Sequence, residues 1–347
     1  MSKIRYILLV VMIALIAPAC QRRPLVEEDL SVILKLDIDY DIPHYAGAKS
    51  AKHMRVSFFD AESDRLRHVE ITGPEGGLIH VPAGDYKMLI HNTGTESTQI
   101  RGKEQFLTTE AYTNEISRTL LGSLKQYLST RQELLSLKNV SEGNHYDTES
   151  ESNNTPTTPQ APEQTRPLDE RIVYTPNHLF VASDEAVNIP IRIAGDAPTV
   201  IEATARSVVE SWYLEVRTVS GIENIGKVTA LITGMVGSNF IADNMRTEEA
   251  VTIYENMAAD RQAQHLTTIF NTFGKQPSER NILSVVITDV AGGQYQYNFD
   301  ISDQFVNNPE RKIIINTDIN IPRPEFGGGG FKPSVDDWDE DHTDIEL

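Results

Sequence analysis

The sequence predicts a mainly β protein built as two tandem antiparallel β-sandwich domains. Three observations lead to this prediction: strict alternation of apolar and polar residues over 31–40, further short apolar runs separated by turn residues over 54–92, and a second series of short runs over 187–321. Strands that follow one another at roughly 8–12-residue spacing, with turn residues between them, are typical of sandwiches. The sequence has no alternation of strands with long helices, which would indicate a parallel sheet.

The first expected domain covers residues 31–185. Its clearest strand is 31–40, where Val32, Leu34 and Leu36 alternate with charged residues, as in a half-buried strand. Pro and Gly in 82–85 mark a turn within the following series. The other strands expected in this domain are 54–59, 67–71, 77–81, 86–92, 171–174 and 178–182.

Residues 112–137 interrupt the strand pattern. Their apolar side chains recur at three- and four-residue steps, as on one face of a helix, although Gly122 costs such a helix about 1 kcal/mol relative to alanine. Residues 141–168 are rich in Ser, Thr, Asn, Pro and Glu, a composition that cannot bury enough apolar surface to order itself. We therefore expect a short helix followed by a disordered insertion within the first domain.

The second expected domain covers residues 186–322. A short helical or irregular connection is expected at 249–256, and residues 323–347 read as a flexible tail that is rich in glycine and then acidic. The strands expected in this domain are 187–193, 199–209, 211–219, 227–233, 282–290, 295–301 and 312–321.

The N-terminus carries the features of an export signal. Lys3 and Arg5 precede an apolar run over 6–17, which is shorter than the roughly 20 residues of a membrane-spanning helix. The run ends in small residues directly before Cys20, the only cysteine of the chain, and this junction resembles a bacterial lipobox. We predict a signal peptide over 1–19, acylation (palmitate) of Cys20, and a lipidated tether over 20–30. The alternative is an ordinary secretory signal with an incidental cysteine.

The charge of the chain restricts its partners. It has 31 basic and 50 acidic residues, a formal net charge of −19. Such a chain repels phosphate backbones, so nucleic acid is not an expected partner. Membrane attachment would come from the lipid on Cys20 and not from a basic patch. With its one cysteine used for lipidation, the mature chain has none left for a disulfide, a cysteine zinc site or thiol catalysis.

No motif in the chain predicts catalysis. HExxH and Gly-x-Ser-x-Gly patterns are absent, and the glycine run 327–330 leads into Lys332 and Pro333, which is not the order of a phosphate-binding loop. Alternate carboxylates in 337–341 lack the glycine and the final glutamate of a calcium loop. We therefore predict a protein that is not an enzyme, with no catalytic, cofactor-binding or metal-binding residues.

Several short motifs resemble a known family. The Cys20 junction, together with 21–25, 54–58, 81–86, 106–112 and 208–216, is similar to Bacteroidota lipoproteins related to fimbrillins and to the anchor subunits of type V fimbriae. The resemblance implies two transthyretin-like sandwiches. It further implies a lipid-anchored protein on the cell surface at the outer membrane, and a role in fimbrium assembly or cell adhesion. Its partners would be fimbrial or other surface-protein subunits.

The same resemblance separates two kinds of subunit. Polymerising fimbrillins lose their first strand to an arginine-specific protease, whereas the loop 41–53 of this chain contains Lys49 and Lys52 but no arginine. This favours a fimbrial anchor that keeps its lipid, although Arg22 and Arg23 in the tether remain possible cleavage sites. The alternative function is a glycan- or ligand-binding outer-membrane lipoprotein of a nutrient-uptake system, which predicts an exposed aromatic cluster at one end of a sandwich.

Overall fold

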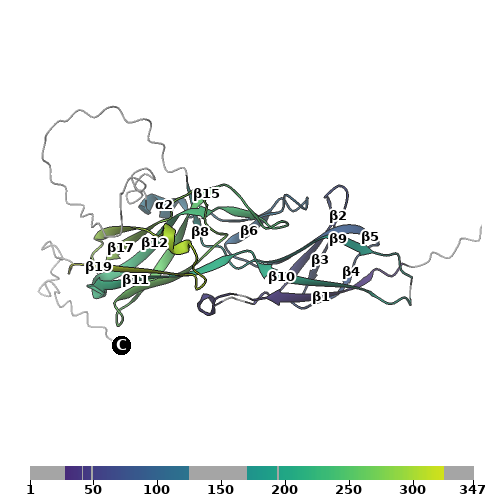
Figure 1. The fold of residues 1–347 in the computed structure, drawn as a ribbon, viewed down its shortest axis with the longest axis horizontal. Helices are drawn as coiled ribbons and strands as arrows, with labels where there is room; N and C mark the ends of the chain where they lie inside the picture. Colours follow the sequence, from purple (N-terminus) through teal and green to yellow (C-terminus); the bar gives the residue numbers. More distant parts are fainter. Residues whose placement is uncertain (1–27, 41, 48–49, 125–169, 194, 324–347) are drawn as a thin grey trace, which may run out of the picture.

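Two β-sandwich bodies lie along the long axis of the molecule, with a small third sheet between them (Figure 1). The computed structural model describes residues 28–40, 42–47, 50–124, 170–193 and 195–323. The described chain starts at the free end of the N-terminal body and ends at the opposite end of the long axis, in the C-terminal body. The predicted signal peptide, most of the predicted tether, the insertion expected at 141–168 and nearly all of the expected tail lie outside the described residues.

The N-terminal body is a seven-stranded sheet in the order β3-β2-β5-β9-β10-β1-β4. β9 and β10 share only two residue pairs, Val181 with Arg206 and Phe180 with Ser207, so the sheet turns a corner there and forms two layers. The strands are β1 (Ser31–Asp39), β2 (Met54–Asp60), β3 (Leu66–Thr72), β4 (Gly76–His80), β5 (Gly84–Asn92), β9 (Phe180–Ile189) and β10 (Thr199–Ser207).

The core of this body comes from alternate positions of its strands. Leu34 of β1, Phe58 of β2 and Met88 of β5 are fully buried in one cluster, with Phe180 of β9 and Ala205 of β10 among its other members. Because successive side chains of a strand point to opposite faces, the polar positions of β1 face outward. The period-two pattern of 31–40 is confirmed.

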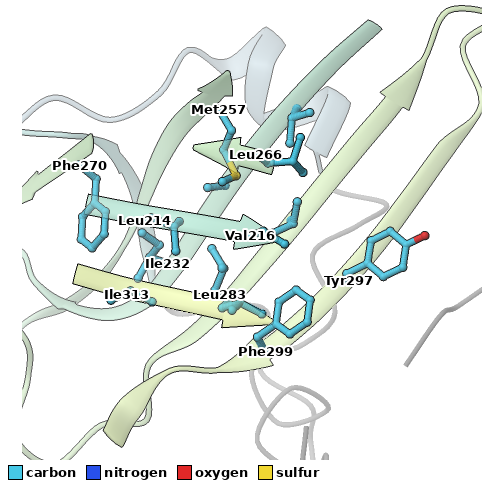
Figure 2. Close-up of a cluster of buried hydrophobic side chains, with 14 of the residues drawn as sticks. Leu214, Val216, Ile232, Met257, Leu266, Phe270, Leu283, Tyr297, Phe299 and Ile313 are labelled. Carbon is cyan, nitrogen blue, oxygen red and sulfur yellow. The ribbon is translucent and has the colours of Figure 1, made fainter. Parts of the chain in front are cut away.

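The C-terminal body is a larger sandwich of the same kind. Its sheet runs β18-β17-β12-β15-β16-β11-β19, with β8 added beside β15. Figure 2 shows part of its core, where Leu214, Ile232, Leu283 and Phe299 come from four different strands. The strands are β8 (Arg171–Tyr174), β11 (Glu210–Ser220), β12 (Ile225–Val236), β15 (Ala250–Asp260), β16 (His265–Thr272), β17 (Ile282–Asp289), β18 (Gln294–Asp300) and β19 (Lys312–Asn320).

A small sheet in the order β14-β13-β7-β6 joins the two bodies. Its strands are β6 (Thr98–Arg101), β7 (Glu110–Thr113), β13 (Ser238–Phe240) and β14 (Met245–Arg246). The helix α2 (Arg118–Leu124) follows β7 and packs on the outer face of the C-terminal sheet, against Ile172, Leu231, Tyr254 and Val286. Three short 3-10 turns complete the described elements: η2 (His44–Ala46), η3 (Ile222–Asn224) and η4 (Ser302–Phe305).

The pairing of strands departs from the expected division at residue 185. That position lies inside β9, and β10 pairs with β1 over eight residues, so the N-terminal body extends to Ser207. In the other direction β8, expected in the first domain, pairs with β15 of the C-terminal body. Consecutive strands are neighbours only about two thirds of the time, so chain order cannot assign these partners.

Two expected elements have different bounds or a different type. The expected helix 112–137 begins only at Arg118, because β7 extends to Thr113 and the next residues, Asn114 to Ile116, are hydrogen-bonded to β8. Its part after Leu124 lies outside the described residues. The irregular connection expected at 249–256 is wrong, since this stretch is most of the central strand β15. Val251 and Ile253 face the core while Tyr254 lies under α2, so both faces are buried and the alternation is lost.

The fold class is confirmed as mainly β with sandwich bodies, but the sheets are mixed. β1 pairs with β10 in parallel, β11 with β19 in parallel, and β8 with β15 in parallel, whereas the remaining pairings are antiparallel. Each parallel pair joins strands that are distant in sequence. The sequence pattern of a half-buried strand is the same in both orientations, so it could not separate them.

Candidate anchoring and assembly site

Cys20, the one site residue predicted from the sequence, lies outside the described residues. The structure therefore describes how the chain enters the N-terminal body from residue 28 onward. Three features of that entry bear on anchoring: a polar clasp on the first residues, the double pairing of β1, and a contact between the loop after β1 and the C-terminal body.

The clasp is formed by Arg192 and the first described residues of the chain. The Asp29 N–H donates to the Arg192 carbonyl oxygen at 3.1 Å, and Glu28 and Ile193 form a β-bridge. The guanidinium of Arg192, only 7% exposed, donates to the Asp29 carboxylate and to the Ser31 carbonyl oxygen. Hydrogen bonds from Ser31, and then the charge of Arg192, hold the pKa of Asp29 below its ordinary value. A buried cation with two partners thus fixes the root of the tether.

β1 is paired along both of its edges. It runs parallel to β10 over eight residue pairs and antiparallel to β4 over five. Gly76 of β4 has φ +85°, and a Cβ there would lie 2.2 Å from the Leu34 carbonyl oxygen, so only glycine permits this approach of the two strands. The first strand is therefore an integral part of the sandwich core and of its hydrogen-bond ladder.

The loop after β1 contacts the C-terminal body through Tyr45. The Tyr45 hydroxyl lies 2.8 Å from the carbonyl oxygen of Arg311 and 3.1 Å from that of Glu310, at the start of β19. Its ring also packs against Tyr213 of β11, with centroids 5.8 Å apart. The hydroxyl has one proton, so it donates to the nearest of these oxygens. This contact ties the end of β1 to the second body.

β19 provides an accessible sheet edge at the far end of the molecule. Among the described strands it pairs only with β11, and side chains of the preceding segment cover the first part of its other edge. Gln304 accepts from the Ile314 N–H at 2.8 Å, and Asn308 donates to the Lys312 carbonyl oxygen at 2.7 Å. Within the described chain, no such side-chain hydrogen bond reaches the backbone of β19 from Asn316 to Asn320. Such an edge can accept an added strand.

A cavity of about 380 Å³ lies between the two bodies, but its wall is already hydrogen-bonded. The Asn92 side chain accepts from the Phe180 N–H at 2.7 Å, and that of Asn177 accepts from the Ser97 N–H at 2.6 Å. None of the residues lining the cavity is Phe, Tyr or Trp, so it offers no ring for a sugar to stack on. Its polar lining includes Lys52, His53, Asn92, Glu96, Asn177 and His178.

The described residues contain neither a cluster of metal ligands nor a membrane-spanning helix. Among the residues that the structure describes, no group of three or more His, Cys, Asp or Glu side chains is placed to hold a metal ion. No helix within the same residues is long and apolar enough to cross a bilayer.

The family of the chain follows from its sequence. A family model described as a domain of unknown function, DUF5119, matches residues 19–256, more than half of the chain. The chain belongs to the DUF5119 family.

A relative of this DUF5119 protein is named for a role in fimbriae. Over 114 residues it is 30% identical to a protein of Bacteroides ovatus that is named as a candidate fimbrium anchoring subunit, Fim4B. The aligned stretch is 33% of each protein, so the DUF5119 chain spans a third of the length of that relative. This homology agrees with the family resemblance predicted from the sequence motifs.

Solved structures share the fold. A candidate adhesin from Bacteroides ovatus matches with a TM-score of 0.56 and 19% identity, over 88% of the DUF5119 chain and 98% of the adhesin. The fimbrial anchor protein Mfa2 from Porphyromonas gingivalis matches with a TM-score of 0.43 and 14% identity, over 82% of this chain and 88% of Mfa2. The first match shows that the DUF5119 protein shares its fold with that adhesin.

Sequence reasoning did not find the clasp or the Tyr45 contact. Arg192 stands in the apolar, alternating stretch 189–193, which indicates extended structure but says nothing about a partner 163 positions earlier in the chain. Tyr45 lies in a loop with no period, and its acceptors are backbone oxygens, which leave no signature in the sequence. The one sequence signal is that Tyr45 is the only tyrosine, phenylalanine or tryptophan in the loop 41–53.

Proposed function

We propose that this DUF5119 protein is a non-catalytic surface lipoprotein that acts as a fimbrial anchor or a fimbrillin-like assembly subunit. Cys20, acylated after signal cleavage, would hold it in the outer membrane with its body on the cell surface. The name of the Fim4B relative and the fold shared with a candidate adhesin support this assignment. Its partners would be fimbrial or other surface-protein subunits.

The pairing of β1 along both edges is the observation that most favours an anchor over a processed stalk subunit. A stalk subunit matured by loss of its first strand would need a cleavage site in the loop after that strand and a strand that can leave. Here the loop 41–53 has no arginine, and β1 is paired on both edges and fixed by Arg192 at its start. An anchor keeps this strand because it connects the lipid to the body.

The free part of the β19 edge is the proposed place for a partner subunit. It lies in the body farther from the tether, where an incoming strand could pair with the backbone from Asn316 onward. The glycan-binding alternative receives less support. Tyr40 is the one aromatic residue among the exposed large apolar side chains of the described chain, and its ring packs on Phe180 instead of joining an aromatic cluster.

The anchor assignment is tested by expression of the wild type and of Cys20→Ala in a bacterium that processes lipoproteins. We expect the wild-type protein to sediment with the outer membrane and to begin at an acylated Cys20 by intact mass. We expect the Cys20→Ala variant to be released or mislocalised with both sandwiches folded. Ser50→Ala, at an exposed loop position of the body, serves as the control. A soluble wild-type product that begins beyond residue 40 would rule out the anchor.

A further inference from the structure

The end of the N-terminal body from which the tether leaves is apolar, and no other described residue covers it fully. Ile191 is 75% exposed, the most exposed large apolar side chain in the described chain, and Ile193 and Leu30 are 49% and 37% exposed. The three residues, here called the open-end patch, lie where the chain enters from Cys20. In Figure 1 the loop between β9 and β10, which contains both isoleucines, lies at that end of the long axis.

The side chains of the open-end patch lie on the core-facing side of their strands, just beyond the residues that the opposite layer of the sandwich covers. Glu28 and Ile193 are bridged antiparallel, a register that sets Leu30 beside Ile191. Residues at alternate positions share a face, so Leu30 continues the face of the fully buried Val32, and Ile191 that of the buried Ile189. The core face therefore continues past the point where the opposite layer ends.

The patch is held rigidly in place. Arg192, between the two isoleucines in sequence, is buried and bonded to Asp29, and the Ile193 N–H donates to the Asp196 carboxylate at 3.0 Å. Because the clasp fixes the backbone on both sides, the isoleucines do not have to be ordered before they can bind something. An exposed, pre-organised apolar surface is typical of an interaction site.

We infer that the open-end patch rests on the bilayer that holds the lipid of Cys20, as a second membrane contact that orients the long axis away from the membrane. This inference rests on the proposed function. Eight residue steps separate Cys20 from Glu28, which reach at most about 28 Å when fully extended. A short tether keeps the patch at a high effective concentration beside the lipid surface, so weak apolar contacts suffice.

The charged residues around the open-end patch indicate which lipid headgroups it can contact. Glu28 lies beside Ile193, and Asp196 follows three residues later, whereas the cation Arg192 is already paired with Asp29. An acidic rim is repelled by anionic headgroups, so the contact is with a surface that is zwitterionic or whose charge is neutralised. Phosphatidylcholine vesicles should therefore hold the patch more strongly than vesicles enriched in phosphatidylglycerol.

A fluorophore at position 191 tests the inference. Cys20 is the only cysteine, and once acylated it leaves Ile191→Cys as the only free thiol for an environment-sensitive dye. The lipidated full chain is placed in phosphatidylcholine vesicles that contain spin-labelled lipid. We expect several-fold stronger quenching at 191 than in the matched control Val306→Cys, an exposed apolar position in the C-terminal body. Adding Ile193→Ser to the labelled chain should reduce the quenching at 191.

Each other outcome overturns the inference in a recognisable way. Equal quenching at 191 and 306 with the lipid present by intact mass refutes the membrane contact and leaves the anchor assignment standing. A blue shift at 191 without vesicles that grows with protein concentration identifies a second copy as the occupant. The same shift independent of concentration identifies residues 21–27 of the chain itself. A chain that is processed but carries no lipid overturns the proposed function and this inference together.

Discussion

Gly76 is the position where one added methyl group should separate β1 from its neighbour. Its φ of +85° and the 2.2 Å between a built Cβ and the Leu34 carbonyl oxygen create two different penalties. The left-handed backbone alone costs an alanine about 1–2 kcal/mol. Gly94 supplies the matched control, because its φ is +78° but its Cβ would meet nothing within 4 Å.

The steric penalty at Gly76 can be worked from the pairing of β1 and β4. Leu34 belongs to the core and to the ladder with β10, so relief must come from β4 moving away. That movement weakens the pairing of Lys35 with Gly76 and the hydrogen bond from the Leu36 N–H to the Glu75 carbonyl oxygen. With about 1 kcal/mol for each of two backbone bonds, Gly76→Ala should cost about 3–4 kcal/mol in total.

Guanidinium unfolding of the mature chain, followed by far-UV circular dichroism, measures this difference. We expect Gly76→Ala to lower the unfolding free energy of the N-terminal body by about 2 kcal/mol more than Gly94→Ala does. Trp212 is buried in the C-terminal body, so its fluorescence transition reports on the other sandwich and should move little. Equal effects of the two alanines would refute the reasoning, because they would show that β1 and β4 do not approach as closely as described.

Two further substitutions test the interior and the contact between the bodies. Burial holds the pKa of His91 at about 4 against an ordinary 6.5, so the unfolded chain binds a proton first as the pH falls. The free energy of unfolding should then drop by up to about 3 kcal/mol between pH 6.5 and 4, and His91→Gln should flatten that part of a urea stability series. Tyr45→Phe removes the donor to the Arg311 carbonyl oxygen, a bond of about 1 kcal/mol, and should speed tryptic cleavage after the exposed Lys52. An unchanged cleavage rate would show that Tyr45 does not hold the loop.

The strands of the N-terminal body could be predicted because their signals are local. β1 alternates between a core face and a solvent face, and the next strands are separated by residues that favour turns. β15 could not be recognised in this way, since α2 covers the face that would otherwise be polar. The remaining indication of a strand in β15 was the run of β-branched and aromatic residues from Val251 to Tyr254. A short, largely apolar run of this kind fits a short helix equally well.

The partners of the strands could not be predicted for a different reason. The pairing of β1 with β10 joins residues 167 positions apart, as in the exposed ion pair of Lys35 with Glu202, and no local pattern encodes such a distance. The clasp is equally non-local, because Arg192 and Asp29 meet only once both body layers are assembled. The prediction for Cys20 could be made from the sequence because a lipobox is a motif of consecutive residues, which does not depend on the fold.

The position of β1 would let it carry force from the predicted lipid tether to the C-terminal body, as an anchor requires. A pull on the tether enters at the clasp and passes along β1, and the loop that follows contacts the start of β19 through Tyr45. β1 runs along the long axis of the molecule, so the proposed partner at the far body would pull nearly parallel to the strand (Figure 1). Under that load the ladder with β10 is sheared, and its bonds over eight residue pairs share the force instead of opening one after another. The retained first strand would thus transmit the pull between the membrane lipid and the body that carries the partner.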